Sequence, residues 1–314
     1  MSSTAQFGVA PDLVPVRLPP APARQLSGAR VLDVAVILLL GAGCAGLAIR
    51  ANAVLGYRWD WSVVGAYLVR TDPATGQLAT NLLLQGFFTT VRLAVWSLAM
   101  GAVLGCAVAA MRLSSRPALR WLGRVFVELV RNVPPVVLIF VFYFFVSSQV
   151  MPTLGLDRAV AAAPAWLQHA AAIVLSPAAR LNDFIAGLAC LGLLAGAYAA
   201  EIIRAGLRSV PATQVEAGRA LGLRPHQVFR LVVLPAALRS VLPALGGQFI
   251  VSIKDSSLVA LISIQELTFV TSEVSSTTRR FFEVWLFTAA FYFALCFTCS
   301  LLFRALEHRW SRAR

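Results

Sequence analysis

Residues 214–235 read QVEAGRALGLRPHQVFRLVVLP, a polar and arginine-rich stretch between two strongly apolar segments. The segments on either side have the composition of helices that lie in lipid, because long apolar runs are typical of membrane spans. The stretch itself carries charged and small residues, which suit contact with water or with a soluble partner. We therefore interpret residues 206–235 as a loop that leaves the membrane.

The loop has the local signals of a helical hairpin. Thr213 and Glu216 are spaced as a capping box, which predicts the start of a short helix. Gly222 suits the left-handed residue that closes such a helix, and Pro225 suits the first position of a second one. We expect the second helix to end near Pro235, where the next apolar segment begins. The alternative is a solvated loop whose arginines anchor two spans.

Composition places the chain in a membrane. Hydrophobic residues make up 59% of the 314 residues and charged residues 13%, whereas soluble domains have about 25% charged residues. The formal net charge of +13 would also suit a nucleic-acid partner, but the arginines lie at the ends of apolar runs. That position is typical of cytoplasmic anchoring. We predict an all-α integral membrane protein that does not bind nucleic acid.

Six apolar segments are long enough to cross about 30 Å of hydrocarbon. They are residues 31–49, 91–111, 133–150, 184–203, 238–262 and 284–303. Gly101 and Gly105 have the GxxxG spacing that predicts close packing of the second segment on another helix. Residues 112–132 are expected to form an amphipathic helix on the inner surface. Six spans place both termini in the cytoplasm, with most basic residues on the inner side.

Two segments leave alternatives open. Residues 159–175 are apolar enough for another span, but a span there would put the 206–235 loop on the opposite side from the arginines of 112–132. We therefore place 159–175 outside the membrane, either re-entrant or not. Residues 1–30 are expected to be a disordered cytosolic tail. Residues 31–49 are interpreted as a retained anchor rather than a signal peptide, whose apolar run is about 7–15 residues.

The sequence lacks the motifs of an enzyme. A phosphate-binding loop of the GxxxxGK[ST] type needs a lysine, and Lys254 is the only lysine and lacks the required glycine before it. The three histidines, His169, His226 and His308, show no metal-ligand spacing. We therefore expect no catalytic centre, no metal and no cofactor in this chain.

The spacing inside the loop resembles the EAA motif of the membrane subunits of ABC importers. The matching residues are Glu216, Ala217, Gly222, Val232, Leu234 and Pro235. Gly218 stands where the motif has its second alanine, which exchanges one small residue for another. The resemblance implies that these seven positions couple the chain to an ATPase.

Neighbouring segments narrow the resemblance. Residues 128–134 (ELVRNVP), 198–206 (YAAEIIRAG) and 254–258 (KDSSL) are similar to segments of the polar amino-acid permeases of histidine/glutamine type. The resemblance covers about residues 80–305, which we interpret as the permease transmembrane domain. The apolar segment before it and the long segment 151–182 depart from the five-span form of that family.

The resemblance implies the core of a type I ABC importer permease in the bacterial inner membrane, with a cytosolic coupling loop. The loop would sit in a groove of a cytosolic ABC ATPase subunit, and ATP used by that partner would drive alternating access. A second permease subunit, identical or different, would complete the pathway in the lipid bilayer. A periplasmic solute-binding protein would deliver the amino acid.

Charged and hydroxyl-bearing residues inside the spans are candidates for a substrate pathway or gate. A central charge costs about 2.5–3.5 kcal/mol on insertion scales, so Lys254 and Asp255 should face protein or water. They either contact a zwitterionic substrate together with Ser256 and Ser257, or form a mutual ion pair that fixes a helix break. Tyr143 lies in an aromatic run that either lines the same pathway or packs against other helices.

Glu201 lies three residues before Arg204, near the inner end of a span. This spacing predicts a structural ion pair beside the coupling loop. The resemblance implies that the chain is the permease subunit of an amino-acid importer. The alternatives are a permease for another small organic solute such as an opine, and an ion-coupled secondary transporter that needs no ATPase.

Overall fold

The computed structural model describes residues 34–36, 38–39, 41–43, 45–46, 49–50, 56–71 and 76–312. The chain divides into two compact units, Met1–Trp59 and Asp60–Arg314. In the first unit, the described residues between 34 and 50 are helical. The predicted tail of residues 1–30 lies outside the described residues, and so does much of the predicted span 31–49.

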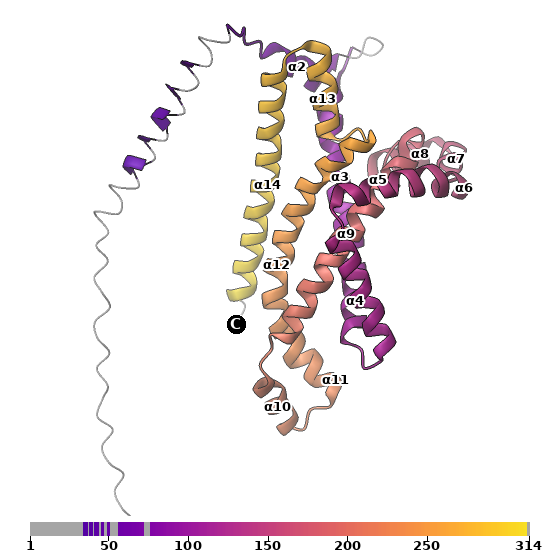
Figure 1. Cartoon of the computed structure of the whole chain (residues 1–314), viewed down its shortest axis with the longest axis vertical. Helices are drawn as coiled ribbons and strands as arrows, with labels where there is room; N and C mark the ends of the chain where they lie inside the picture. Colours follow the sequence, from indigo (N-terminus) through magenta and orange to yellow (C-terminus); the bar gives the residue numbers. More distant parts are fainter. Residues whose placement is uncertain are drawn as a thin grey trace, which may run out of the picture. The chain divides into compact units, whose positions relative to one another are not determined.

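The second unit consists mainly of long helices (Figure 1). Five of the helical stretches that the structure describes are long and apolar enough to cross a membrane. They are Leu82–Leu113, Pro135–Leu154, Ala178–Arg208, Pro225–Ile262 and Phe281–Ala305. These stretches coincide with five of the six predicted spans, and each is longer than predicted.

Several of these stretches join more than one element. The first stretch is α3 (Leu82–Leu113), and the fifth is part of α14 (Phe281–Arg312). The second joins α5 (Pro135–Val141), the π-helix η1 (Phe142–Val150) and α6 (Met151–Leu154), and the third joins the 3₁₀ turn η2 (Ala178–Arg180) and α9 (Leu181–Arg208). The fourth joins α11 (Pro225–Val228), the π-helix η3 (Phe229–Val233), α12 (Leu234–Asp255) and the 3₁₀ helix η4 (Ser256–Ile262).

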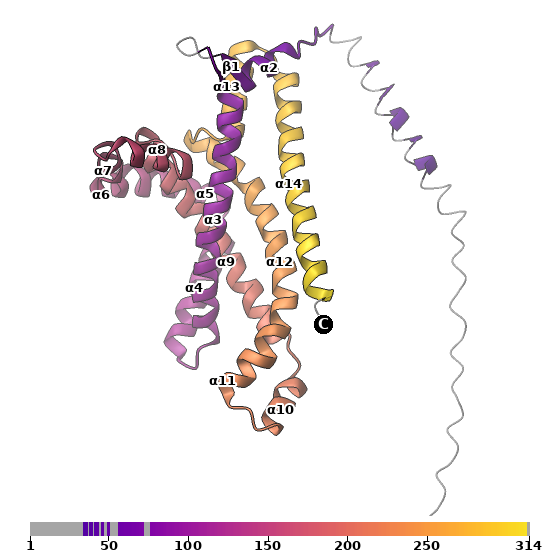
Figure 2. The ribbon, with the colours of Figure 1, turned by 180° about the vertical axis from the view of Figure 1, so that it is seen from behind.

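Shorter elements complete the unit. They are α2 (Ser62–Leu68), the strands β1 (Val69–Thr71) and β2 (Leu78–Thr80), α4 (Pro117–Asn132), α7 (Leu156–Ala161), α8 (Ala165–Val174), α10 (Ala212–Ala220) and α13 (Leu267–Thr278). The two strands pair antiparallel, with Arg70 opposite Ala79. Figures 1 and 2 show α10 and α11 at one end of the unit, here called the loop end, and α2 and α13 at the other, here called the α13 end.

Helices α3 and α9 form the most extensive contact between elements of the described residues. A Cβ atom added at Gly101 would lie 2.6 Å from Cβ of Ala195, and one added at Gly105 would lie 2.6 Å from Cβ of Ala199. The two backbones therefore approach as closely as small residues permit, as the GxxxG spacing predicts. The buried core beside this contact contains large apolar side chains of several elements, namely Leu93, Ile139, Phe184, Leu191 and Val259.

The segment around 159–175 does not span a membrane, as predicted. Helix α8 has ten residues and is therefore about 15 Å long, half of the hydrocarbon thickness. Both views show α5 to α8 projecting sideways from α3 and α9. The predicted amphipathic helix at 112–132 begins at Pro117, since Arg112 belongs to the last turn of α3.

Glu266 joins three helices at the α13 end. Its side chain is fully buried and accepts hydrogen bonds from the backbone N–H groups of Thr268 and Phe269, both at 2.9 Å, which cap the start of α13. It also accepts from the hydroxyls of Tyr292 on α14, at 2.8 Å, and of Thr90 on α3, at 3.2 Å. Burial raises the pKa of the Glu266 carboxyl, because the charged form loses water that these hydrogen bonds only partly replace.

We predict that Gly101→Ala destabilises the fold by about 1–3 kcal/mol, because the new methyl group meets Cβ and backbone atoms that cannot move aside cheaply. Thermal unfolding of the purified chain in detergent measures the effect. Gly247→Ala is the matched control, since Gly247 is a glycine of α12 with open space where its Cβ would lie. Equal unfolding temperatures for the two variants would contradict the close α3–α9 contact.

We predict that Glu266 makes stability fall as the pH rises. Its pKa is raised in the folded chain, so folding favours the protonated form, and this contribution is complete only below the unfolded pKa of about 4.3. The contribution is lost as the pH rises through the raised pKa. The unfolding temperature of the wild type, relative to that of Glu266→Gln, should therefore decrease as the pH increases from about 4.3.

The control for this measurement is Glu273→Gln, which changes an exposed carboxylate of the same helix. The wild type and Glu273→Gln should show the same pH dependence. If the difference between the wild type and Glu266→Gln does not change with pH, the interpretation of Glu266 is wrong.

Candidate functional site

The predicted hairpin is present at the loop end. Helix α10 ends in a Schellman motif, in which the N–H of Gly222 donates to the carbonyl of Arg219 at 2.9 Å and the N–H of Leu223 donates to that of Gly218 at 3.3 Å. Gly222 has a φ of 76°, a left-handed conformation that favours glycine. Pro225 then occupies the first turn of α11, as predicted.

Two details of the predicted hairpin are wrong. The capping box of Thr213 and Glu216 is not formed, because Pro211 is the N-cap and Thr213 already lies inside the first turn of α10. The second helix does not end near Pro235 but continues through η3 into α12. The wider π-turn immediately before Pro235 accommodates a residue that has no N–H to donate to the helix.

The seven predicted coupling residues fall into two groups, which differ in their burial. Gly218 is buried where α10 crosses η3, and a Cβ added there would make ordinary contacts of 3.4 Å and 3.5 Å with Val232 and Val228. Val232, Leu234 and Pro235 are half-buried. The other group, Glu216, Ala217 and Gly222, is exposed, next to Leu221, which is 81% exposed.

The exposed group is free to contact another molecule. Within the described part of the chain, Glu216 makes no ion pair with Arg219 or any other residue. The hairpin thus presents the carboxylate of Glu216 and the exposed side chain of Leu221, while its inner face packs through Gly218 against Val228 and Val232.

The predicted ion pair between Lys254 and Asp255 is absent from the described residues. Consecutive residues of a helix point about 100° apart, so their side chains do not face each other. A change of helix type does occur here, since α12 ends at Asp255 and η4 begins at Ser256. The hydroxyls of Ser256 and Ser257 donate to the carbonyls of Ile253, at 2.6 Å, and Lys254, at 2.7 Å.

Tyr143 lies in η1 and is half-buried against the hydrophobic core that contains Leu191 and Val259. Its ring makes an edge contact with Phe144, with 5.3 Å between the centroids. The structure thus brings Tyr143 into packing contact and leaves Lys254 exposed on α12.

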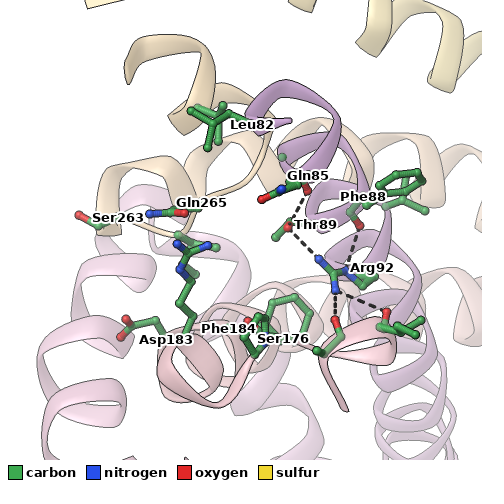
Figure 3. A pocket seen from close by; sticks show the side chains of 18 residues that line it. Leu82, Gln85, Phe88, Thr89, Arg92, Ser176, Asp183, Phe184, Ser263 and Gln265 are labelled. Carbon is green, nitrogen blue, oxygen red and sulfur yellow. Dashed lines mark hydrogen bonds between the residues drawn. The ribbon is translucent and has the colours of Figure 1, made fainter. Parts of the chain in front are cut away.

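A cavity of about 680 Å³ lies elsewhere, between α3, the segment after α8, the first turn of α9 and the loop before α13 (Figure 3). None of the predicted pathway residues lines it. Its polar lining includes Gln85, Thr89, Arg92, Arg180, Asp183 and Gln265. Sequence analysis missed it, although Arg92 is the only charged residue between Leu82 and Met111. A lone cation in an apolar run is a signal of function.

Arg92 forms one wall of the cavity. Its guanidinium donates to the last carbonyls of α8, those of Ala172 and Ile173, and to the hydroxyl of Thr89 at 3.0 Å. Trp96, one turn further along α3, donates to the carbonyl of Val174 at 2.9 Å. These bonds satisfy carbonyls that the end of a helix leaves unpaired, and they fix α8 against α3.

Asp183 lies on a different wall of the cavity, at the start of α9 (Figure 3). One carboxylate oxygen accepts a hydrogen bond from the hydroxyl of Ser147 at 2.5 Å. The cavity therefore presents the guanidinium groups of Arg92 and Arg180 and the carboxylate of Asp183, with the amide side chains of Gln85 and Gln265 in the same lining. Such an arrangement matches a ligand that carries both charges.

Glu201 forms the predicted ion pair with Arg204 and a second one with Arg112 of α3. The second pair was not predicted, because 89 positions separate the two residues. The side chains are only 15–27% exposed, so their attraction is less screened than that of surface pairs. The triad ties α3 to α9 at the loop end.

Comparisons with known proteins agree with this geometry. Residues 97–312 match the family described as the binding-protein-dependent transport system inner membrane component. The chain is similar to the probable glutamine ABC transporter permease protein GlnM of Bacillus subtilis (strain 168), with 34% identity over 74% of this chain and 95% of GlnM. It is also 34% identical to the octopine transport system permease protein OccM of Rhizobium meliloti, over 73% of this chain and 85% of OccM.

One solved structure, the crystal structure of an amino acid ABC transporter with histidines, is similar in fold and sequence. The TM-score is 0.58 and the identity 31%, over 73% of this chain and 94% of that chain. The family match covers more than half of the chain, over the region that holds α9, the hairpin and α12. The chain therefore belongs to the family of binding-protein-dependent transport system inner membrane components.

Proposed function

We propose that this chain is the permease subunit of an ATP-driven importer that carries amino acids across the inner membrane. The observation that carries the proposal is the hairpin of α10 and α11, which is rigid inside and presents Glu216 and Leu221 outside. The similarity to GlnM favours an amino acid as the solute, and the similarity to OccM makes octopine the second candidate.

The hairpin is suited to dock into a groove of a cytosolic ABC ATPase subunit. Its Schellman turn fixes the angle between α10 and α11, so the exposed residues keep one arrangement. ATP would be hydrolysed by that partner, and this chain would hold no cofactor or metal of its own. Two permease subunits, driven by two ATPases, would then alternate between outward and inward access.

The hairpin is directly connected to the cavity. The helical stretch that starts at Pro225 runs for 38 residues to Ile262 and is therefore about 57 Å long. It ends at Ser263, a residue in the left-handed conformation with a φ of 62°, and Ser263 lines the cavity. A displacement of the hairpin would thus reach the cavity wall through one continuous helix.

The distribution of charge sets the orientation that we propose. Arginines of α3, α4 and α9 gather at the loop end, and the positive-inside rule places that end in the cytoplasm, together with both termini. The cavity lies toward the α13 end and would then face the side on which a periplasmic solute-binding protein delivers its solute. Arg92 and Asp183 would attract the carboxylate and the ammonium of an amino acid.

Lys254 supports a second permease subunit. It is exposed on α12, inside a stretch long and apolar enough to span the membrane. A charged ammonium group in contact with lipid is unfavourable in free energy, so protein or water should surround it. A second subunit against this face would enclose a pathway that includes Lys254, Asp255 and Ser257, whereas the predicted pathway residue Ser256 is fully buried and would not line it. In this arrangement the solute would pass from the cavity toward these residues.

We predict that Glu216→Ala and Gly222→Val abolish uptake and ATPase binding without preventing membrane insertion. The first removes the exposed carboxylate, and the second strains a backbone with positive φ by about 1–3 kcal/mol. Gln214→Ala is the control, because Gln214 is an exposed residue of α10 outside the seven coupling positions and should leave uptake intact. Co-purification and uptake into proteoliposomes measure the effects. Normal uptake by both variants, or ion-coupled uptake without an ATPase, would refute the proposal.

We predict that Asp183→Asn raises the amino-acid concentration for half-maximal uptake about 10-fold or more, because a hydrogen bond to a charged group contributes about 1.5–3 kcal/mol. The asparagine retains an oxygen for the hydroxyl of Ser147, so the fold should not change. Glu273→Gln, which changes an exposed carboxylate outside the cavity, should not affect uptake. An unchanged half-maximal concentration in Asp183→Asn would exclude the cavity as the substrate site.

A further inference from the structure

A second cavity, of about 210 Å³, lies at the loop end and is lined by five arginines. Arg112 ends α3, Arg120 and Arg124 lie on α4, and Arg204 and Arg208 lie near the end of α9. We refer to this cavity as the arginine pocket. It belongs neither to the hairpin nor to the cavity at the α13 end.

The pocket has more positive charge than its neighbours neutralise. Glu201 pairs with Arg112 and Arg204. The other three arginines are exposed and form no ion pair within the described residues. Arg120 and Arg124 are four residues apart on one helix face, where like charges destabilise a helix.

Close packing holds these guanidinium groups together. A Cβ added at Gly123 would lie 2.8 Å from Cγ of Arg112 and 3.3 Å from the carbonyl oxygen of Val108, so α4 lies directly on α3. Gly123 and Val127 are the buried residues of α4. Repulsion between the arginines therefore cannot be relieved by moving α4 away without losing this contact.

The positions of the arginines are only partly explained by helix dipoles. Arg112 and Arg208 lie in the last turns of α3 and α9, where a cation is stabilised. Arg120 lies near the start of α4, where a cation is unfavourable, and the first turn of α4 has no acidic residue. An anion in the pocket would remove both the repulsion and this mismatch.

Exposed apolar side chains follow two of the pocket arginines in the sequence. Trp121, next to Arg120, is 65% exposed, and Leu113, next to Arg112, is 40% exposed. Tryptophan is enriched at the boundary between lipid and water. A ligand with an anionic head and apolar chains matches this combination.

We propose that the arginine pocket binds the phosphate group of an anionic phospholipid, with the acyl chains along Trp121 and Leu113. A guanidinium group can form bidentate hydrogen bonds with two phosphate oxygens. Basic pockets between helices on the cytoplasmic side of membrane proteins bind anionic headgroups. Only the peptide from Ser209 to Pro211 separates Arg208 from α10. Occupancy of the pocket therefore stabilises the base of the hairpin.

The test uses the purified full-length chain in a neutral detergent, at constant ionic strength. Phosphatidylglycerol, phosphatidylcholine and sodium phosphate are titrated separately, and the unfolding temperature and the lipid retained in native mass spectra are measured. Phosphatidylglycerol should raise the unfolding temperature and remain bound. Phosphatidylcholine and sodium phosphate should have much weaker effects.

Arg120→Gln combined with Arg124→Gln should weaken phosphatidylglycerol binding about 10-fold or more. The matched control combines Arg116→Gln with Arg239→Gln, which removes two exposed arginines outside the pocket and should bind as the wild type does. Equal weakening in both double variants would show non-specific attraction to surface charge and overturn the proposal. A response to sodium phosphate but not to phosphatidylglycerol would also overturn it, in favour of a soluble phosphate ligand.

Discussion

The contact between the backbones of α3 and α9 is the constraint on which the rest of the unit depends. Gly101 and Gly105 allow it, since any side chain at either position would meet Ala195 or Ala199. Because the two helices lie this close, each end of α3 can form polar contacts with a neighbouring helix. At the loop end Arg112 reaches Glu201, and at the other end Arg92 reaches the carbonyls of α8.

The cavity follows from how α8 ends. A helix that ends in or near lipid must have its last carbonyls paired, because no water is available there. Arg92 and Trp96 supply the donors from α3, so α8 is held beside α3 rather than packed into it. The opposite wall, which includes Gln265, is held by Glu266, whose buried carboxylate joins α13 to α3 and α14. Two polar clusters thus keep open a space that apolar packing would close.

Local signals in the sequence were sufficient to predict the five long helical stretches that the structure describes, but not the contacts between residues far apart in the chain. The apolar runs, the spacing of Gly101 and Gly105, and the left-handed Gly222 each depend on neighbouring residues, and the structure confirms them. The pairing of Arg112 with Glu201 and of Thr90 with Glu266 joins residues 89 and 176 positions apart, which one sequence cannot reveal. The expected end of a helix near Pro235 was wrong because a π-turn lies before the proline.

That π-turn bears on how motion would pass from the hairpin into the membrane. The hairpin has no flexible joint to α12, since η3 and α12 follow α11 without a break, and Gly218 fixes α10 against Val228 and Val232. A push on α10 would therefore bend the helix where its hydrogen bonding is weakest, at η3 and at Pro243. In the function that we propose, the packed residues of the motif would transmit force and its exposed residues would receive it, so loss of either group would weaken coupling.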